Sequence, residues 1–228
     1  MAAGDALHAE LNARDALMVF EELLFDTPRS YDLLWRAARE SVNLGILADE
    51  GRERKGRFRQ AETYGRLAVT ADPAGVAGHY WLAVALVRQA LLSNPREKAN
   101  LSDEILREGQ AVLALEPNHP GALHVVGQWH AEMMRLTGVA HFMAVKVLGG
   151  DGLRDASWEK AEALLSRAAE LEPAVLSHYL ELARVYADTE RTHQALTALQ
   201  EVLARPALEP ADLQFKKEAE ALLATLVG

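Results

Sequence analysis

The side chains best suited to chemistry in this chain are its eight histidines. A metal site needs several such ligands to converge. His124 and His130 lie six residues apart, on different faces of a helix, and no histidine pair has the His-x3-His spacing of a helical site. The chain has no cysteine, and no serine–histidine–carboxylate or paired-carboxylate arrangement stands out. We therefore expect no enzyme activity, no metal site and no cofactor.

A second set of residues is suited to binding. It combines an aromatic ring, two arginines, two histidines, an amide and two leucines, and ligand sites commonly pair an apolar lining with a few polar groups. We expect these residues on the concave face of successive helix pairs, where they line a ligand groove or simply pack against inserted segments. They are Trp35, Arg39, His79, Leu82, Leu86, His124, Gln128 and Arg184.

One basic cluster lies between the two helices expected in the first full pair. It has five cations, Arg52, Arg54, Lys55, Arg57 and Arg59, and one anion, Glu53. Such a cluster could hold a phosphate headgroup at a membrane surface or an acidic partner. The alternative is a solvated loop that leads into a helix at Phe58, and the pattern favours this alternative.

Composition excludes several classes of function. The formal net charge is −9, and an acidic surface repels the phosphate backbone of nucleic acids. No uncharged apolar run is long enough to span a bilayer, and the first residues lack the basic start and apolar core of a signal peptide. We expect a soluble protein, cytoplasmic as the sequence stands and periplasmic if a signal peptide has been removed.

The elements that must position these side chains follow from an internal repeat. A polar or acidic residue precedes proline at Thr27-Pro28, Asp72-Pro73, Glu116-Pro117 and Glu172-Pro173. Twelve residues before these prolines stand Ala16, Ala61, Ile105 and Ala161. In the tetratricopeptide pattern, a small residue occupies this place because two helices cross there closely. The repeat predicts stacked helix pairs.

The predicted first helices follow a large-x-x-large-small-x-x-aromatic pattern, best kept by Tyr179, Leu182, Ala183 and Tyr186. The repeat predicts an opening helix at 5–25, pairs at 29–48 with 56–71, 74–92 with 99–115, 119–137 with 157–171 and 174–188 with 191–204, and a closing helix at 211–226. The fold class is therefore all-α: a curved α-solenoid of about four tetratricopeptide-like pairs, with inserted helices and a C-terminal capping helix. We expect a single domain over 1–228.

Wide insertions within the pairs, together with four richer motifs, make the chain similar to the regulator of microtubule dynamics family. The motifs begin at Leu33 (Leu-Leu-Trp-Arg-Ala-Ala-Arg), His79 (His-Tyr-Trp-Leu-Ala), Ala122 (Ala-Leu-His-Val-Val-Gly-Gln-Trp) and Ala156 (Ala-Ser-Trp-Glu-Lys-Ala). The resemblance covers residues 5–225 and implies a helical repeat domain without catalytic residues. Eukaryotic members are linked to microtubules and to lipid binding or transfer at membrane contacts. Because this sequence looks bacterial, we do not carry over the microtubule role.

Two binding functions remain open. The chain could hold a lipid or similar amphiphile in the concave groove, or it could be a scaffold that binds a peptide or protein segment there. Leu82 and Leu86 at the centre of the groove favour the amphiphile, as does the family resemblance. The segment Val139–Leu148 is almost wholly apolar and too short to span a membrane. It could close an apolar pocket as a lid, with Arg39 at the mouth, or fill the groove as plain core.

Overall fold

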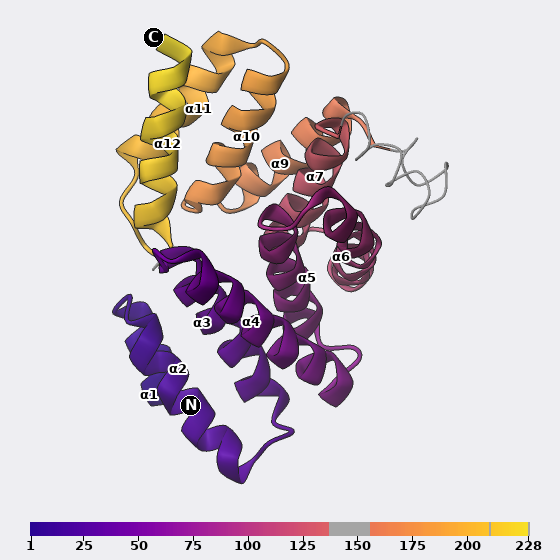
Figure 1. The fold of residues 1–228 in the computed structure, drawn as a ribbon, viewed down its shortest axis with the longest axis vertical. Coiled ribbons are helices and arrows are strands. Elements are labelled where there is room, and N and C mark those ends of the chain that lie inside the picture. The colour runs from indigo at the N-terminus through magenta and orange to yellow at the C-terminus, as the bar shows by residue number, and fades with distance from the viewer. Residues whose placement is uncertain (137–155, 210, 228) are drawn as a thin grey trace. The chain divides into compact units, whose positions relative to one another are not determined.

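The fold consists of helices throughout the part of the chain that the structure describes. This computed structural model describes residues 1–136, 156–209 and 211–227, and every regular element in these ranges is an α-helix (Figure 1). The all-α prediction is confirmed. The predicted helix over 139–148 lies outside the described residues, as does any lid that it would form.

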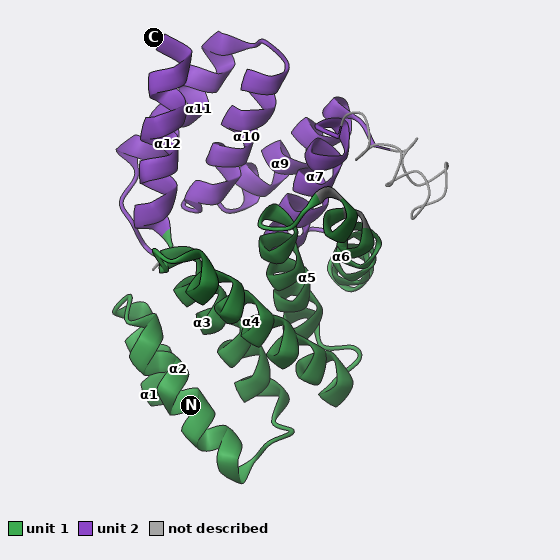
Figure 2. Ribbon diagram, viewed as in Figure 1, with its two compact units in different colours: residues 1–117, 209–211 green, residues 118–208, 212–228 purple. Residues whose placement is uncertain are grey.

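The helices fall into two compact units, residues 1–117 with 209–211 and residues 118–208 with 212–228 (Figure 2). Unit 1 contains α1 (Ala2–Ala9), α2 (Ala13–Asp26), α3 (Tyr31–Leu47), α4 (Gly51–Ala71), α5 (Val76–Leu91) and α6 (Pro95–Leu115). Unit 2 contains α7 (Pro120–Met134), α9 (Trp158–Leu171), α10 (Leu176–Asp188), α11 (Thr192–Ala204) and α12 (Asp212–Val227).

Helices that follow one another in the chain pack against one another in each unit. In unit 1, α3 packs on α4 and α5 on α6, while α4 also packs on α5. In unit 2, α7 packs on α9 and α10 on α11, and α12 covers α11 and α10. These are the predicted tetratricopeptide-like pairs and the predicted closing helix, so each pair buries one face only by stacking on the next.

Helices end at the four polar or acidic residues that precede proline, as the repeat predicts. Thr27, Asp72, Glu116 and Glu172 are the C-caps of α2, α4, α6 and α9. Their ψ angles lie between 66° and 95°, outside the helical region, because the proline ring crowds a preceding residue in helical conformation. The next helix can therefore begin a few residues later in a new direction.

The crossing positions are also confirmed. Ala16, Ala61 and Ala161 are fully buried, and Ile105 is nearly so. A Cβ added at Gly127 would lie 2.9 Å from Cγ of Leu165 and 3.2 Å from the Ala161 carbonyl oxygen, so α7 and α9 approach almost to backbone contact there. Small residues at this place allow the two helices to bury their large neighbours.

The predicted opening helix is wrong in one respect, because residues 5–25 form two helices. The chain breaks at Leu11, whose φ of 62° is left-handed. The amide of Leu11 donates to the His8 carbonyl, and the amide of Asn12 donates to the Leu7 carbonyl, which together form a Schellman ending. The Asn12 side chain then accepts from the Asp15 amide and caps α2.

Two of the predicted insertions lengthen helices instead of forming inserted helices of their own. Helix α4 begins at Gly51 and α6 at Pro95, each earlier than predicted, and each spans 21 residues. An Asn94–Glu97 capping box fixes the start of α6. The basic cluster is therefore the first two turns of α4, and the predicted loop is wrong.

Candidate functional site

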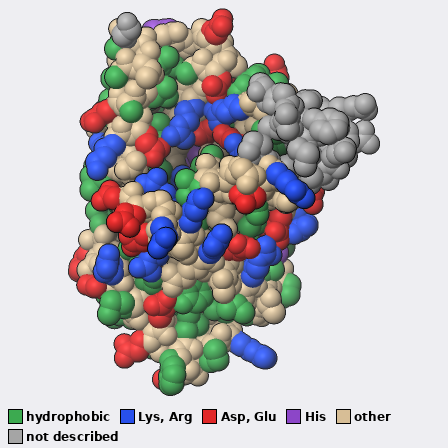
Figure 3. All heavy atoms as spheres, viewed as in Figure 1, with side chains coloured by type: hydrophobic (Ala, Val, Ile, Leu, Met, Phe, Trp, Pro, Cys, Tyr) green, Lys and Arg blue, Asp and Glu red, His purple; other side chains and the backbone are tan. Residues whose placement is uncertain are grey.

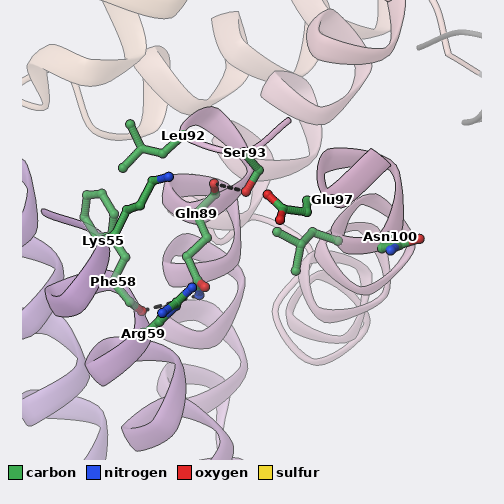
Figure 4. Close-up of a pocket in the computed structure, with 9 residues that line it drawn as sticks. Lys55, Phe58, Arg59, Gln89, Leu92, Ser93, Glu97 and Asn100 are labelled. Carbon is green, nitrogen blue, oxygen red and sulfur yellow. Dashed lines mark hydrogen bonds between the residues drawn. The ribbon is translucent and has the colours of Figure 1, made fainter. Parts of the chain in front are cut away.

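A cavity lies within unit 1, where the first turns of α4 and α6 face the end of α5. Its volume is about 330 Å³. Figure 4 shows residues of α4 on one wall, residues of α6 on the opposite wall, and the end of α5 between them. The lining residues are Lys55, Phe58, Arg59, Gln89, Leu92, Ser93, Glu97, Asn100 and Leu101.

The wall made by α4 is set by one buried ring. Phe58 is 3% exposed, and a Cβ added at Gly45 of α3 would lie only 2.4 Å from the Phe58 ring. This close fit fixes the rotation of the first turns of α4. Lys55 and Arg59 are four residues apart, so they share one face of the helix and both line the cavity.

The base of the cavity is polar and held in place by hydrogen bonds. The Gln89 amide donates to the Glu62 carboxylate over 2.7 Å and to the Phe58 carbonyl over 3.4 Å. The Ser93 hydroxyl donates to the Gln89 carbonyl over 2.8 Å. Two of these bonds, Gln89 to Phe58 and Ser93 to Gln89, appear as dashed lines in Figure 4. The base is therefore preorganised.

The cations of the basic cluster divide into paired and unpaired groups. Arg54 donates to the Ala48 carbonyl, with the shorter bond 2.7 Å, and Arg57 donates to Gln60 over 3.1 Å. Among the described residues, the charged ends of Lys55 and Arg59 have no ion pair or hydrogen-bond partner. Figure 3 shows Lys and Arg side chains gathered across the part of this face that unit 1 forms. The cavity thus presents uncompensated positive charge on one wall.

The opposite wall has a different character. Glu97 and Asn100 are exposed on the first turns of α6. The Glu97 carboxylate accepts a 3.4 Å bond from the Asn94 amide, which is part of the helix cap. In the described part of the chain, the Asn100 amide has no partner. The cavity is therefore cationic on the α4 wall and able to accept hydrogen bonds on the α6 wall.

The groove residues predicted in unit 1 lie elsewhere on its helices. The Trp35 ring has the Arg36 guanidinium carbon 4.1 Å and that of Arg39 5.5 Å from its centroid. His79 is 2.6 Å from the Glu108 carboxylate and 2.9 Å from the Pro73 carbonyl.

Arg39 pairs with a buried carboxylate, and Leu82 and Leu86 pack in the interior of unit 1. Arg39 donates to the fully buried Glu40 carboxylate over 2.6 Å. Leu82 and Leu86 are buried, and a Cβ added at Gly65 would lie 2.9 Å from the Leu82 Cα. Their packing is the alternative that the sequence left open, and a ligand role for them stays a prediction.

The groove residues predicted in unit 2 join buried polar groups. His124 Nδ1 lies 3.1 Å from Nδ1 of the buried His178. Gln128 donates to the Glu181 carboxylate over 3.4 Å, and Arg184 donates to it over 3.0 Å. Arg184 also reaches Glu218 of the closing helix, over 2.7 Å. A ligand role for these three residues also stays a prediction.

Glu181 is the centre of this second group. It is 2% exposed and also accepts a 2.8 Å bond from Arg135. Burial would raise the pKa of the Glu181 carboxyl, but the charges and hydrogen bonds of Arg135 and Arg184 outweigh burial and lower that pKa below its ordinary value. The group is thus an internal charge network and leaves Arg184 little freedom to meet a ligand.

Sequence reasoning missed most of the cavity. Lys55 and Arg59 were recognised in the basic cluster, but Ser93, Glu97 and Asn100 were not. The signal was the Asn94-Pro95-x-Glu97 motif, which marks a capped helix start and so places the next residues opposite the first turns of α4.

The described ranges 1–136, 156–209 and 211–227 contain neither a cluster of metal-binding side chains nor a helix that could span a membrane. No three histidine, aspartate or glutamate side chains converge there as a metal ion would require. None of the helices in these ranges combines the length and the apolar character that crossing a bilayer demands.

Comparison with known proteins settles the family. The family model described as regulator of microtubule dynamics protein 1-3 matches residues 1–227, nearly the whole chain. The chain belongs to this family.

Curated members of the regulator of microtubule dynamics family are distant relatives. Regulator of microtubule dynamics protein 2 of Macaca fascicularis is 23% identical over 210 residues, which cover 90% of this chain and 51% of that protein. The Mus musculus protein is 22% identical over 224 residues, which cover 96% of this chain and 54% of that protein. The chain therefore spans about half the length of the curated relatives it matches.

A solved structure agrees with the fold of this family member. A crystal structure of a thermophilic TPR protein from Thermus thermophilus aligns with a TM-score of 0.69 at 21% sequence identity. The alignment covers 98% of this chain and 96% of that one. At this level of identity the likeness concerns the fold alone, which is the tetratricopeptide-type helical repeat that the sequence predicts.

Proposed function

We propose that this regulator of microtubule dynamics family member is a non-catalytic scaffold that binds a peptide segment of a partner protein. The observation that carries the proposal is the cavity between α4, α5 and α6. Its polar base is preorganised, and its two walls offer unpartnered hydrogen-bonding groups within the described residues. A peptide backbone and its side chains supply the complementary donors and acceptors.

The character of the cavity supports binding over catalysis. Among the described residues, no histidine lines it, and the one hydroxyl that does, on Ser93, donates to the Gln89 carbonyl. A hydroxyl nucleophile needs an adjacent base to activate it. Its volume of about 330 Å³ fits one or two side chains of a longer segment. The cavity is therefore suited to a docking point for part of a segment.

The amphiphile carrier receives less support. That function needs an open apolar groove, and Leu82 and Leu86, expected at its centre, are buried. The lid expected over 139–148 lies outside the described residues. A lipid would also meet Lys55, Arg59, Glu97 and Asn100 at the described cavity, where polar groups outnumber large apolar ones. We therefore favour the scaffold.

The relatives' name associates them with microtubule dynamics, and the present chain spans about half of their length. We expect the partner to be recognised through a short segment, whichever protein supplies it. This expectation does not depend on the activity of the longer relatives.

A peptide array tests the proposal. The full chain, fluorescently labelled, is incubated with an array of short synthetic peptides of varied composition, and hits are titrated by fluorescence anisotropy. We expect a subset to bind saturably. Asn100→Trp, which replaces a lining side chain by a large ring, should abolish that binding. Gln110→Trp should not, because Gln110 is equally exposed on α6 and does not line the cavity.

Two results would contradict the scaffold. One is an array without saturable hits while a fluorescent fatty acid binds saturably, which would restore the carrier. The other is loss of peptide binding with Gln110→Trp as well as with Asn100→Trp, because the site would then lie away from the cavity.

A further inference from the structure

The positive wall of the cavity has a specific relation to the rest of the basic cluster. Arg54 is used to hold the Ala48 carbonyl at the end of α3, and Arg57 reaches Gln60 and, over 3.9 Å, Glu53. These two cations serve the fold. Within the described residues, Lys55 and Arg59 have charges that no internal group neutralises, although the chain is acidic overall.

The unpaired cations are also positioned. The buried Phe58 ring against Gly45 fixes which face of α4 meets the cavity, so Lys55 and Arg59 line one wall together. Two cations on one wall form a site in which an anionic group accepts from both, and a guanidinium can hold a carboxylate with two parallel bonds.

We propose that Lys55 and Arg59 recognise the carboxylate of an aspartate or glutamate in the bound peptide. This inference rests on the scaffold function. It assigns the partner segment to the acidic class and the specificity of the cavity to the α4 wall. The exposed Arg52 is on the same helix but does not line the cavity, so it takes no part.

The opposite wall limits the charge that fits. Lys55 and Arg59 contribute two positive charges, and Glu97 contributes one negative charge. One carboxylate therefore neutralises the cavity, whereas a doubly charged phosphate would leave an excess of negative charge facing Glu97. Glu97 and Asn100 can instead meet backbone amides of the segment beside its acidic side chain. The cavity favours a carboxylate flanked by hydrogen-bond donors.

A membrane surface fits the same cations less well than an acidic peptide does. Polybasic segments that bind acidic lipids carry about 4–8 lysines and arginines in a cluster, each reaching the lipid surface. Internal bonds of Arg54 and Arg57 reduce the free cations of this cluster, as described, to Arg52, Lys55 and Arg59. Two of those three, Lys55 and Arg59, line a cavity and not a flat surface.

The test uses the full chain and the tightest acidic hit from the peptide array. Its acidic residues are replaced one at a time by the matching amide, and all versions are titrated against the wild type, Lys55→Ala, Arg59→Ala and the double variant. One acid-to-amide change should weaken binding. Each single alanine should weaken the acidic peptide roughly three- to fivefold and the double variant roughly tenfold, since exposed cations contribute modestly.

Matched controls separate this site from general charge. Arg52→Ala removes the same charge from the same helix and should leave the affinity unchanged. Lys55→Arg keeps the charge and should bind nearly as the wild type does. The amide version of the peptide should bind the wild type and the double variant alike. All variants are at exposed positions, and circular dichroism should show unaltered helicity.

Each adverse result has a distinct meaning. Peptides that bind with no preference for acidic residues, or equal losses with Arg52→Ala and Lys55→Ala, would overturn the carboxylate site and leave the scaffold standing. A phosphoserine peptide that binds more tightly than its glutamate version would replace carboxylate by phosphate. Binding of the wild type to anionic phosphatidylserine vesicles, lost in the double variant, without binding to any peptide, would overturn both proposals.

Discussion

At the scale of single residues, buried charge accounts for two arginines that sequence analysis placed at a ligand. Glu40 and Glu181 are both buried carboxylates on first helices of pairs. A buried charge is tolerated only with partners. Arg39 donates to Glu40, and Arg184 and Arg135 both donate to Glu181. The pattern that suggests a cation facing a ligand is thus also the pattern of a cation that neutralises an internal carboxylate.

Glu181→Gln should destabilise unit 2. The change keeps the shape of the side chain but removes the charge that Arg135 and Arg184 share, so we expect the free energy of unfolding to fall by about 1.5–3 kcal/mol at neutral pH. Urea denaturation followed by circular dichroism measures this loss. Glu170→Gln is the control, because the Glu170 side chain is 66% exposed and its one described pair, with Arg167, is at the surface.

The difference in stability between the wild type and Glu181→Gln should depend on pH. The pKa of Glu181 is lower in the folded protein than its unfolded value of about 4.3. Its contribution to stability is therefore complete well above that value and is lost as pH falls through the folded pKa. The difference between wild type and Glu181→Gln should shrink as the pH is lowered below about 4.3. A difference that stays constant or widens on acidification would contradict the lowered pKa.

At the scale of helices, the sequence predicts helix ends better than helix beginnings. The ends follow from proline, because its ring restricts the backbone of the preceding residue and this local effect can be predicted from sequence alone. The beginnings of α4 and α6 depend on whether extra turns find something to pack on, as Phe58 does against Gly45. The helix break at Leu11 is harder to predict, because leucine rarely adopts a left-handed backbone and the residue type gives no sign of a helix end.

The crossing of α7 and α9 offers a direct test of the repeat register. Ala161 is fully buried beside Gly127, so Ala161→Phe must push the helices apart, at a cost of about 1–3 kcal/mol. The melting temperature should fall measurably. Ala163→Phe, at an exposed position of the same helix, should leave it nearly unchanged. Equal melting temperatures for wild type and Ala161→Phe would reject the register.

At the scale of the whole molecule, the sequence predicts one domain over 1–228, and the structure has two compact units. Only residues 116–119 connect α6 to α7, and the family match runs through this connection. We therefore expect one cooperative unfolding transition. Variants that keep tryptophans only in unit 1 (Trp35, Trp81) or only in unit 2 (Trp129, Trp158) report on each unit by fluorescence. Transitions at different urea concentrations would divide the chain into two domains.

The fold was more predictable than the site for a physical reason. Helix pairs repeat, so each pair confirms the pattern of the others. The cavity occurs at one place and depends on the meeting of three helix segments, two of which exceed the repeat length. Lys55 and Arg59 could be recognised as cations, but whether they were paired required the positions of Ala48, Gln60 and Glu53.

The first turns of α4 and α6 carry exposed cavity-lining residues that lie apart from the helix crossings. The residues that line the cavity on these helices all precede Ala61 and Ile105, the buried positions where each helix crosses its partner. Mutations of the exposed lining residues can therefore change the ligand while the crossings, and the packing of Phe58 against Gly45, remain intact. Members of one family can in this way keep a common architecture and diverge in what they bind, because selection on affinity and selection on stability act on different residues of the same helix.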